Sequence, residues 1–263
     1  MKILAIGDVV GKPGRQAVKQ LVVKMKKKNE VDFVIANGEN SAGGSGYTDK
    51  TAMELLASNV DVITSGDHVF KKRDILSYIE KEDRLLRPAN YPKGVPGCGY
   101  VILPFKDDVK IAVVNILGRV FLKPLRCPFK TMETLLDKIR EVTPNIIVDF
   151  HAEATSEKIA MGWFLDGKVS AVVGTHTHVQ TSDEIILPKG TAYITDLGMT
   201  GPIDSVLGRD VSNVLEHFLT GMPARFHVAK DNIQLQGVIM DIDEKTGKAK
   251  SIKRIKLKLD EAS

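Results

Sequence analysis

Polar residues that can bind metal ions recur along the chain wherever a predicted strand ends. Asp8 follows the apolar run at 2–6, and Glu39 and Asn40 follow the run at 32–36. Open α/β sheets build their sites at the carboxyl ends of such strands. We therefore expect one site assembled from distant segments: Gly7-Asp8, Asn37-Gly38-Glu39-Asn40, Gly66-Asp67-His68, Asp149-Phe150-His151 and His176-Thr177-His178.

The histidines strengthen this prediction, because four of the six in the chain fall in those segments. In an extended segment His176 and His178 point to the same face, about 7 Å apart at roughly 3.3 Å per residue, where they can serve one metal ion or two adjacent ions. A histidine taken alone is more often a hydrogen-bonded core residue than a ligand. We interpret His217 and His227, which lie outside these segments, in that way.

The donor set indicates two ions rather than one. Carboxylates, a carboxamide and imidazoles form a mixed oxygen and nitrogen set that suits iron, manganese or zinc. A catalytic zinc takes about three protein ligands, which is fewer than this set offers. Two ions about 3.5–4 Å apart, sharing a bridging carboxylate, polarise a phosphoryl group and activate water for in-line attack. The pattern therefore predicts a binuclear centre.

Signatures of other catalytic chemistries are missing from the sequence. The glycine-rich stretch at 38–46 lacks the Gly-Lys-Ser/Thr ending of a Walker loop, and no Gly-x-Gly-x-x-Gly follows a strand. There is no Gly-x-Ser-x-Gly elbow. Cys98 and Cys127 have no suggestive partner, and we expect free thiols.

The composition is that of a globular protein. The chain has 263 residues, 43% of them hydrophobic, with 37 Lys and Arg against 33 Asp and Glu and a net charge of +4. We expect one domain over residues 1–263. No apolar run approaches the roughly 18–20 residues of a membrane span, and Asp8 ends the first apolar stretch too early for a signal peptide, so we expect a cytoplasmic protein. Local lysine clusters at 24–28 and 250–258 suit a helix end and a strand edge better than a nucleic-acid-binding face.

Apolar periodicity predicts the elements that must position these residues. Up to residue 64, short apolar runs alternate with segments of helical spacing, which is typical of parallel β-α-β units. From Arg87 the runs are punctuated by Pro and Gly and indicate a second sheet, and the tail from Arg225 is typical of antiparallel strands. We therefore predict an α/β fold of two packed mixed sheets covered by helices. The expected strands are 2–6, 32–36, 61–64, 100–103, 110–115, 145–150, 169–174, 184–187 and 191–195, and the expected helices are 16–28, 48–59, 130–140 and 156–160.

These segments resemble motifs of the calcineurin-like metallophosphoesterase superfamily and, within it, of the YmdB-type phosphodiesterases active on 2′,3′-cyclic nucleotides. The motifs GDVVG, NGEN, GDH, RPANYP, DFHAEATSEK, GTHTHVQT and ITDLGMTGP occur in family order over essentially the full length. The superfamily's Asp-x-His opening and Gly-Asp second motif are replaced by Asp8-Val9-Val10 and Glu39-Asn40, as in the YmdB-type branch. Where the family has Gly-Asn-His, this chain has Gly66-Asp67-His68. The resemblance implies a four-layer α/β/β/α sandwich.

The resemblance also implies a metal-dependent phosphodiesterase. A metal-bridging hydroxide would attack phosphorus, and His68 would be the general acid for the leaving ribose oxygen. The ions would be iron or manganese, with zinc or magnesium as alternatives. The ligand set that it implies is Asp8, Asn40 and His178 for one ion, Asp67, His151 and His176 for the other, and Glu39 as the bridge.

Several alternatives stay open. Arg119, after the strand at 110–115, is either a phosphate clamp or a surface residue. The substrate is a cyclic nucleotide, an RNA end or another phosphodiester, with a phosphomonoester as the alternative. A weakly active, metal-containing regulatory or RNA-associated protein is a further alternative, and a homo-oligomer is compatible with the sequence.

Overall fold

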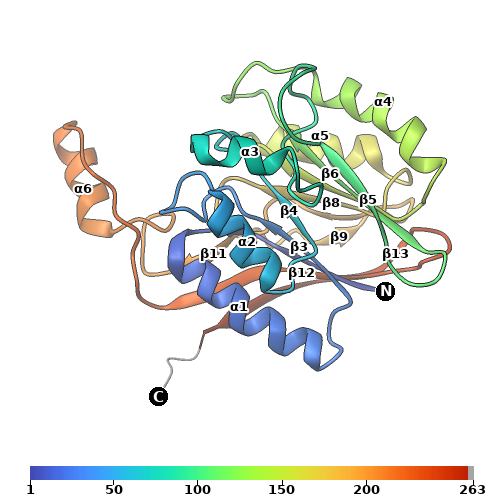
Figure 1. Cartoon of the computed structure of the whole chain (residues 1–263), viewed down its shortest axis with the longest axis horizontal. Coiled ribbons are helices and arrows are strands. Elements are labelled where there is room, and N and C mark those ends of the chain that lie inside the picture. Colours follow the sequence, from blue (N-terminus) through green and yellow to red (C-terminus); the bar gives the residue numbers. More distant parts are fainter. Residues whose placement is uncertain (260–263) are drawn as a thin grey trace.

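Two β-sheets pack face to face and carry helices on their outer faces in the computed structural model, which describes residues 1–259 (Figure 1). The first sheet contains β1 (Lys2–Ile6), β2 (Asp8–Val9), β3 (Phe33–Asn37), β4 (Val62–Thr64), β11 (Met199–Pro202), β12 (Ile233–Ile242) and β13 (Ala249–Lys258). The second contains β5 (Tyr100–Pro104), β6 (Lys110–Leu117), β7 (Ile146–His151), β8 (Ala171–Thr175), β9 (Ile185–Ile186) and β10 (Ala192–Ile194).

Both sheets mix parallel and antiparallel pairs. The first has the order β2-β11-β12-β1-β3-β4, with β13 also paired to β12; β1, β3 and β4 are parallel, and β12 runs antiparallel to β1. The second has the order β5-β6-β7-β8-β10-β9, with β6, β7, β8 and β10 parallel. The parallel strands of each sheet end at a common edge, which is where the predicted ligands lie.

Strand alternation separates the layers, because successive side chains point to opposite faces. In β1, Leu4 and Ile6 pack in the core that includes Val18, whereas Ile3 and Ala5 pack in the core between the sheets. A third core lies between the second sheet and its helices. The helices are α1 (Gly11–Lys27), α2 (Asp49–Ala57), η1 (Arg73–Ile75), α3 (Leu76–Ile79), α4 (Pro128–Arg140), α5 (Thr155–Leu165) and α6 (Val211–Thr220).

These layers confirm the predicted fold class. The apolar runs form strands within a residue or two of the expected bounds, and Thr48 caps α2 by accepting from Thr51 N. Helix α1 begins five residues earlier than predicted, at Gly11, because Pro13 is compatible with a first helical turn. Gly14 packs against the Thr200 carbonyl, where a Cβ would overlap it.

Helix α6 was missed by the sequence analysis, although it carries both end signals. The Asp210 side chain accepts from Ser212 N and Asn213 N at its start, and Gly221 adopts a left-handed φ of 68° at its end. In Figure 1 this helix stands away from the two sheets. No helix within residues 1–259 has the length and apolar character needed to cross a membrane.

Candidate metal centre

The predicted ligands come from both sheets and meet where the parallel strands end. Glu39 and Asp67 follow β3 and β4 of the first sheet, while His151 ends β7 and His176 follows β8 of the second. Gly66 lies against the His151 ring, and a Cβ at Gly66 would overlap that ring. A glycine is therefore required for the two sheets to bring these ligands together.

One cluster contains Glu39, Asp67, His151 and His176, each with a ligand atom within 4.8 Å of the others. His151 Nε2 lies 3.3 Å from Glu39 Oε1 and 3.2 Å from Asp67 Oδ1. His176 Nδ1 lies 2.9 Å from His151 Nε2. Donors bound to one ion at about 2.0–2.2 Å lie roughly 3–4 Å from one another, so this spacing suits a common ion.

A second cluster, of Asp8, Asn40 and His178, adjoins the first. Asn40 Nδ2 lies 3.1 Å from His178 Nε2, 3.4 Å from Asp8 Oδ1 and 3.4 Å from Glu39 Oε1. Glu39 Oε1 is thus close to members of both clusters. The Asn40 amide presents its nitrogen to this cluster, so ligation through Oδ1 requires the amide to turn by about 180°.

Charge in the two clusters is balanced by imidazoles. Burial favours the neutral acid of Asp8, but His178 and His151 outweigh it and hold the pKa of Asp8 well below its usual range. Burial also disfavours the charged form of His151. The carboxylates of Glu39 and Asp67 outweigh this effect and raise the pKa of His151 well above its ordinary value. A metal ion would replace the protons that carry this positive charge.

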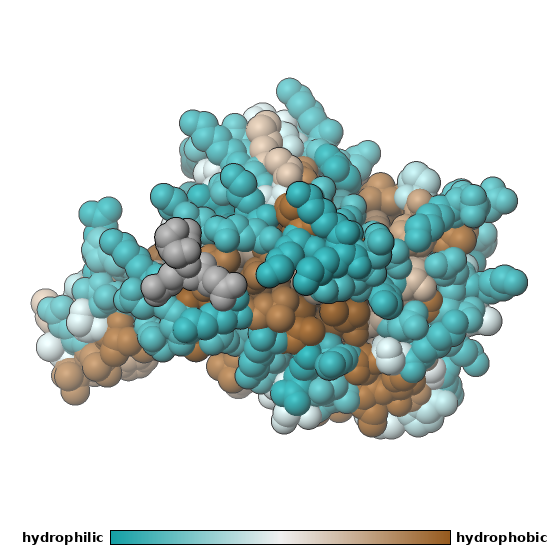
Figure 2. Space-filling view, turned by 90° about the horizontal axis from the view of Figure 1, so that it is seen from below, coloured by the Kyte–Doolittle hydropathy of each residue, from teal (hydrophilic) through white to brown (hydrophobic). Residues whose placement is uncertain are grey.

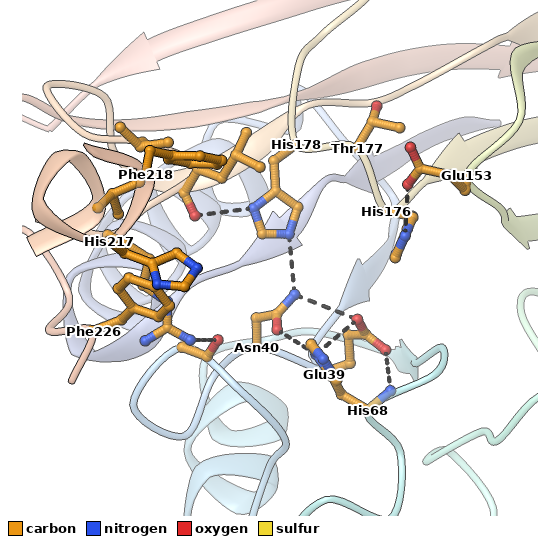
Figure 3. Close-up of a pocket in the computed structure, with 15 residues that line it drawn as sticks. Glu39, Asn40, His68, Glu153, His176, Thr177, His178, His217, Phe218 and Phe226 are labelled. Atoms are coloured by element: carbon orange, nitrogen blue, oxygen red, sulfur yellow. Dashed lines mark hydrogen bonds and ion pairs between the residues drawn. The ribbon is translucent and has the colours of Figure 1, made fainter. Parts of the chain in front are cut away.

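His68 lies at the open side of the site, with its side chain 33% exposed. Its Nδ1 is 3.0 Å from Asn40 Oδ1, and its backbone N donates to Glu39 Oε2 at 3.1 Å. Figure 3 shows its ring beside Glu39 and Asn40 in the pocket. The imidazole is therefore held by the proposed ligands while it stays open to the pocket.

The turn after β8 differs from the extended segment predicted for the two histidines. His176 has a φ of 104° and His178 a φ of 63°, both in the left-handed region. The turn lets the two rings serve different clusters. Asp196 fixes it by accepting from Thr177 N at 3.1 Å and Thr177 Oγ1 at 2.7 Å.

Asp196 is itself held by a fully buried ion pair. Lys158 Nζ, on α5, donates to Asp196 Oδ2 at 2.7 Å, and Gly198 N donates to Asp196 Oδ1 at 2.8 Å. Because an unpaired buried charge is strongly destabilising, Lys158 and Asp196 depend on each other. The pair joins α5 to the turn that carries both histidines.

The sequence analysis placed Asp149 in the expected site but did not predict the polar network that Asp149 forms behind the clusters. Asp149 Oδ1 accepts from Thr175 Oγ1 at 2.7 Å, and Thr175 Oγ1 lies 2.9 Å from His151 Nδ1. Burial raises the pKa of Asp149 to about 6, although the hydroxyls of Thr64 and Thr175 favour its charged form. This chain orients His151 from behind. Asp149 lies inside a strand, and no local pattern distinguishes such a residue from a ligand.

Glu153 was missed as well, although it lies two residues after His151. Its Oε2 is 2.9 Å from His176 Nε2, so it orients the ring whose Nδ1 faces the first cluster.

Arg119 does not line the pocket: its side chain is exposed and its backbone N donates to Glu157 at 3.0 Å. The core interpretation of the two remaining histidines was wrong, because His217 lines the pocket from α6 and His227 is exposed.

A family model described as "YmdB-like protein" matches residues 4–255. The chain belongs to the YmdB-like family. This confirms the resemblance drawn from the motifs. The chain is 51% identical, over 97% of its length and 96% of the relative, to a 2′,3′-cyclic-nucleotide 2′-phosphodiesterase of Bacillus subtilis (strain 168). It is 38% identical, over 98% of its length and 93% of the relative, to a putative phosphatase/phosphodiesterase of Mycoplasma pneumoniae.

Solved structures share the fold of this YmdB-like chain. A hypothetical protein from Thermus thermophilus superposes with a TM-score of 0.92 at 38% identity, covering 98% of this chain and 99% of that one. A crystal structure described as a novel phosphatase from Mycoplasma pneumoniae gives a TM-score of 0.91 at 37% identity, covering 98% and 93%.

The buried pair makes a testable contribution to the stability of the YmdB-like fold. We expect Lys158→Met to lower the free energy of unfolding by about 3–5 kcal/mol, because Asp196 is left charged and unpaired. Urea unfolding measures this change. Lys130→Met, which breaks the exposed pair with Glu133, serves as the control and should leave the unfolding midpoint almost unchanged. A loss below about 1 kcal/mol in Lys158→Met would contradict the assignment.

Proposed function

We propose that this YmdB-like protein is a metal-dependent phosphodiesterase that hydrolyses 2′,3′-cyclic nucleotides with His68 as general acid. The proposal is carried by the convergence of two ligand clusters on one carboxylate, Glu39, beside an open pocket of about 550 Å³. The name of the Bacillus subtilis relative supports the substrate class.

The donor set suits two metal ions of the kind that accept both oxygen and nitrogen ligands. Its mixture of carboxylate and amide oxygens with imidazole nitrogens favours iron or manganese, with zinc or magnesium as alternatives. When bound, the ions neutralise phosphoryl oxygens and activate water for in-line attack. The proposed ligands are Asp8, Asn40 and His178 for one ion, Asp67, His151 and His176 for the other, and Glu39 for both.

His68 has the placement that a general acid needs. Its backbone N donates to Glu39 Oε2, and its ring lines the pocket in which the diester would lie. Imidazole is the side chain best suited to move a proton near neutral pH. We infer that it delivers a proton to the ribose oxygen as the bond to phosphorus breaks.

A phosphomonoesterase on the same scaffold is the second candidate, because the Mycoplasma relatives carry names that include phosphatase. Monoesters and diesters differ in their pocket contacts rather than in the metal ligands. A comparison of bis-p-nitrophenyl phosphate with p-nitrophenyl phosphate separates the two. RNA ends with a 2′,3′-cyclic phosphate belong to the same substrate class.

A cytoplasmic location and a homo-oligomeric state stay predictions from the sequence.

Metal removal tests the centre as a whole. We expect a chelator to abolish hydrolysis of 2′,3′-cyclic AMP and to lower Tm, since an ion at 1,000 times its Kd stabilises the folded state by about 4 kcal/mol. Added manganese or iron should restore both properties, and chelator already saturated with metal is the control. Full activity in the metal-free protein, verified by elemental analysis, would refute the metal requirement.

The role of His68 is tested by His68→Ala. We expect kcat for the cyclic diester to fall by about 10²–10⁴-fold while the metal content is kept, because the variant loses the acid and none of the proposed ligands. His227→Ala, at an exposed histidine outside the pocket, is the matched control. Parental turnover in His68→Ala would contradict the role of His68 as general acid.

Asp67 is the chain's own departure from the Gly-Asn-His pattern. Replacing it by Asn removes one negative charge beside His151 and His176, so metal retention should weaken while Lewis acidity and affinity for an anionic substrate rise. We expect metal dissociation to become easier by about tenfold, as for roughly 1.4 kcal/mol of lost attraction. Metal content after graded chelation and kcat at saturating metal measure the two effects. Tighter metal binding in Asp67→Asn would contradict this account.

A further inference from the structure

The pocket beside the metal-binding clusters extends to a wall that the proposed chemistry does not use. Figure 3 shows His217, Phe218 and Phe226 grouped on one side of the pocket, with His68 and His176 on the other. Phe218 is 78% exposed although it is a large aromatic side chain. Core packing therefore gives no reason for an aromatic residue at this position.

The wall is an ordered aromatic cluster. The His217 ring lies 5.6 Å from that of Phe226 at an interplanar angle of 86°, and 5.8 Å from that of Phe218 at 58°. His217 Nδ1 lies 2.8 Å from the Met222 carbonyl oxygen, which can only accept, so Nδ1 carries the proton. This hydrogen bond holds the His217 ring against the two phenyl rings.

The chain that leads into α6 is tied to the metal-binding loops. The Arg209 guanidinium donates to the Gly43 carbonyl at 2.9 Å and also to the Gly44 carbonyl. His178 Nδ1 lies 3.3 Å from the Leu207 carbonyl oxygen. These contacts set the distance between the aromatic wall and the proposed ligands, although α6 stands outside the sheets.

We propose that Phe218, Phe226 and His217 form a nucleobase subsite, so that the base of the substrate stacks on this wall while its cyclic phosphate lies at the metal-binding clusters. The inference rests on the proposed function and deepens it. Aromatic side chains bind bases through their faces with little sequence preference. A pocket with a charged, polar end and an aromatic end matches a molecule with an anionic phosphate and a flat base.

The test compares two substrates that differ only in the base: 2′,3′-cyclic AMP and the 2′,3′-cyclic phosphate of methyl riboside. We expect the wild type to prefer cyclic AMP in kcat/KM, and Phe218→Ala to reduce this preference at least about fivefold, mainly through KM. Phe218→Trp should keep it. Leu219→Ala is the matched control, because Leu219 is the adjacent residue of α6, is 83% exposed and does not line the pocket.

Each contrary result has a distinct meaning. Equal preference in the wild type and Phe218→Ala overturns the subsite. A loss shared by Phe218→Ala and Leu219→Ala, together with a lower sedimentation coefficient in both, also overturns it and assigns the exposed end of α6 to contact between copies of the chain. If the wild type hydrolyses neither substrate, the proposed function fails, and calorimetric binding of the same two ligands to the wild type and Phe218→Ala still decides the subsite.

Discussion

Mutual repulsion of carboxylates is the constraint on which the rest of this structure depends. Asp8, Glu39 and Asp67 meet at the edge of the two sheets, and across residues 1–259 no lysine or arginine side chain forms an ion pair with any of them. The carboxylates instead face the imidazoles of His151 and His178, and this contact raises the pKa of both rings. Buried charges persist only when they are paired or coordinate metals, so the folded arrangement itself calls for cations.

The support for this arrangement lies outside the ligand clusters. Left-handed backbone at His176 and His178 is unfavourable by about 1–3 kcal/mol at each residue and persists only where the surroundings determine it. Asp196 does so through its bonds to Thr177, and Lys158 stabilises the Asp196 charge. The core, the α5 helix and the strained turn therefore act together to aim the two rings at different clusters.

The sequence predicted the parts of the molecule whose signal is local. Apolar runs marked the strands, and strand ends marked the proposed ligands, because parallel strands must deliver their next residues to one edge. The strand-end signal marked Asp149 without showing its role behind His151, and Glu153 had no such signal, since both roles come from partners in other segments. The interpretation of His217 was wrong for a related reason: α6 has no sheet beneath it, so its histidine lies in the pocket wall instead of a core.

Two sides of the same pocket are held in different ways. The loops with the proposed ligands are held by the sheets, whereas the aromatic wall belongs to the α6 segment, which lies between β11 and β12 in the chain. The ligand loops are bound by strand register, by close contacts such as Gly66 against His151, and by the Lys158–Asp196 pair, so their residues have little freedom to change. The α6 segment contacts the body mainly through its base, at Arg209 and Leu207, and leaves Phe218 exposed (Figure 2 shows hydrophobic residues at this projecting end). Substitutions on its pocket face can therefore alter the aromatic wall without disturbing the charge balance among the proposed ligands.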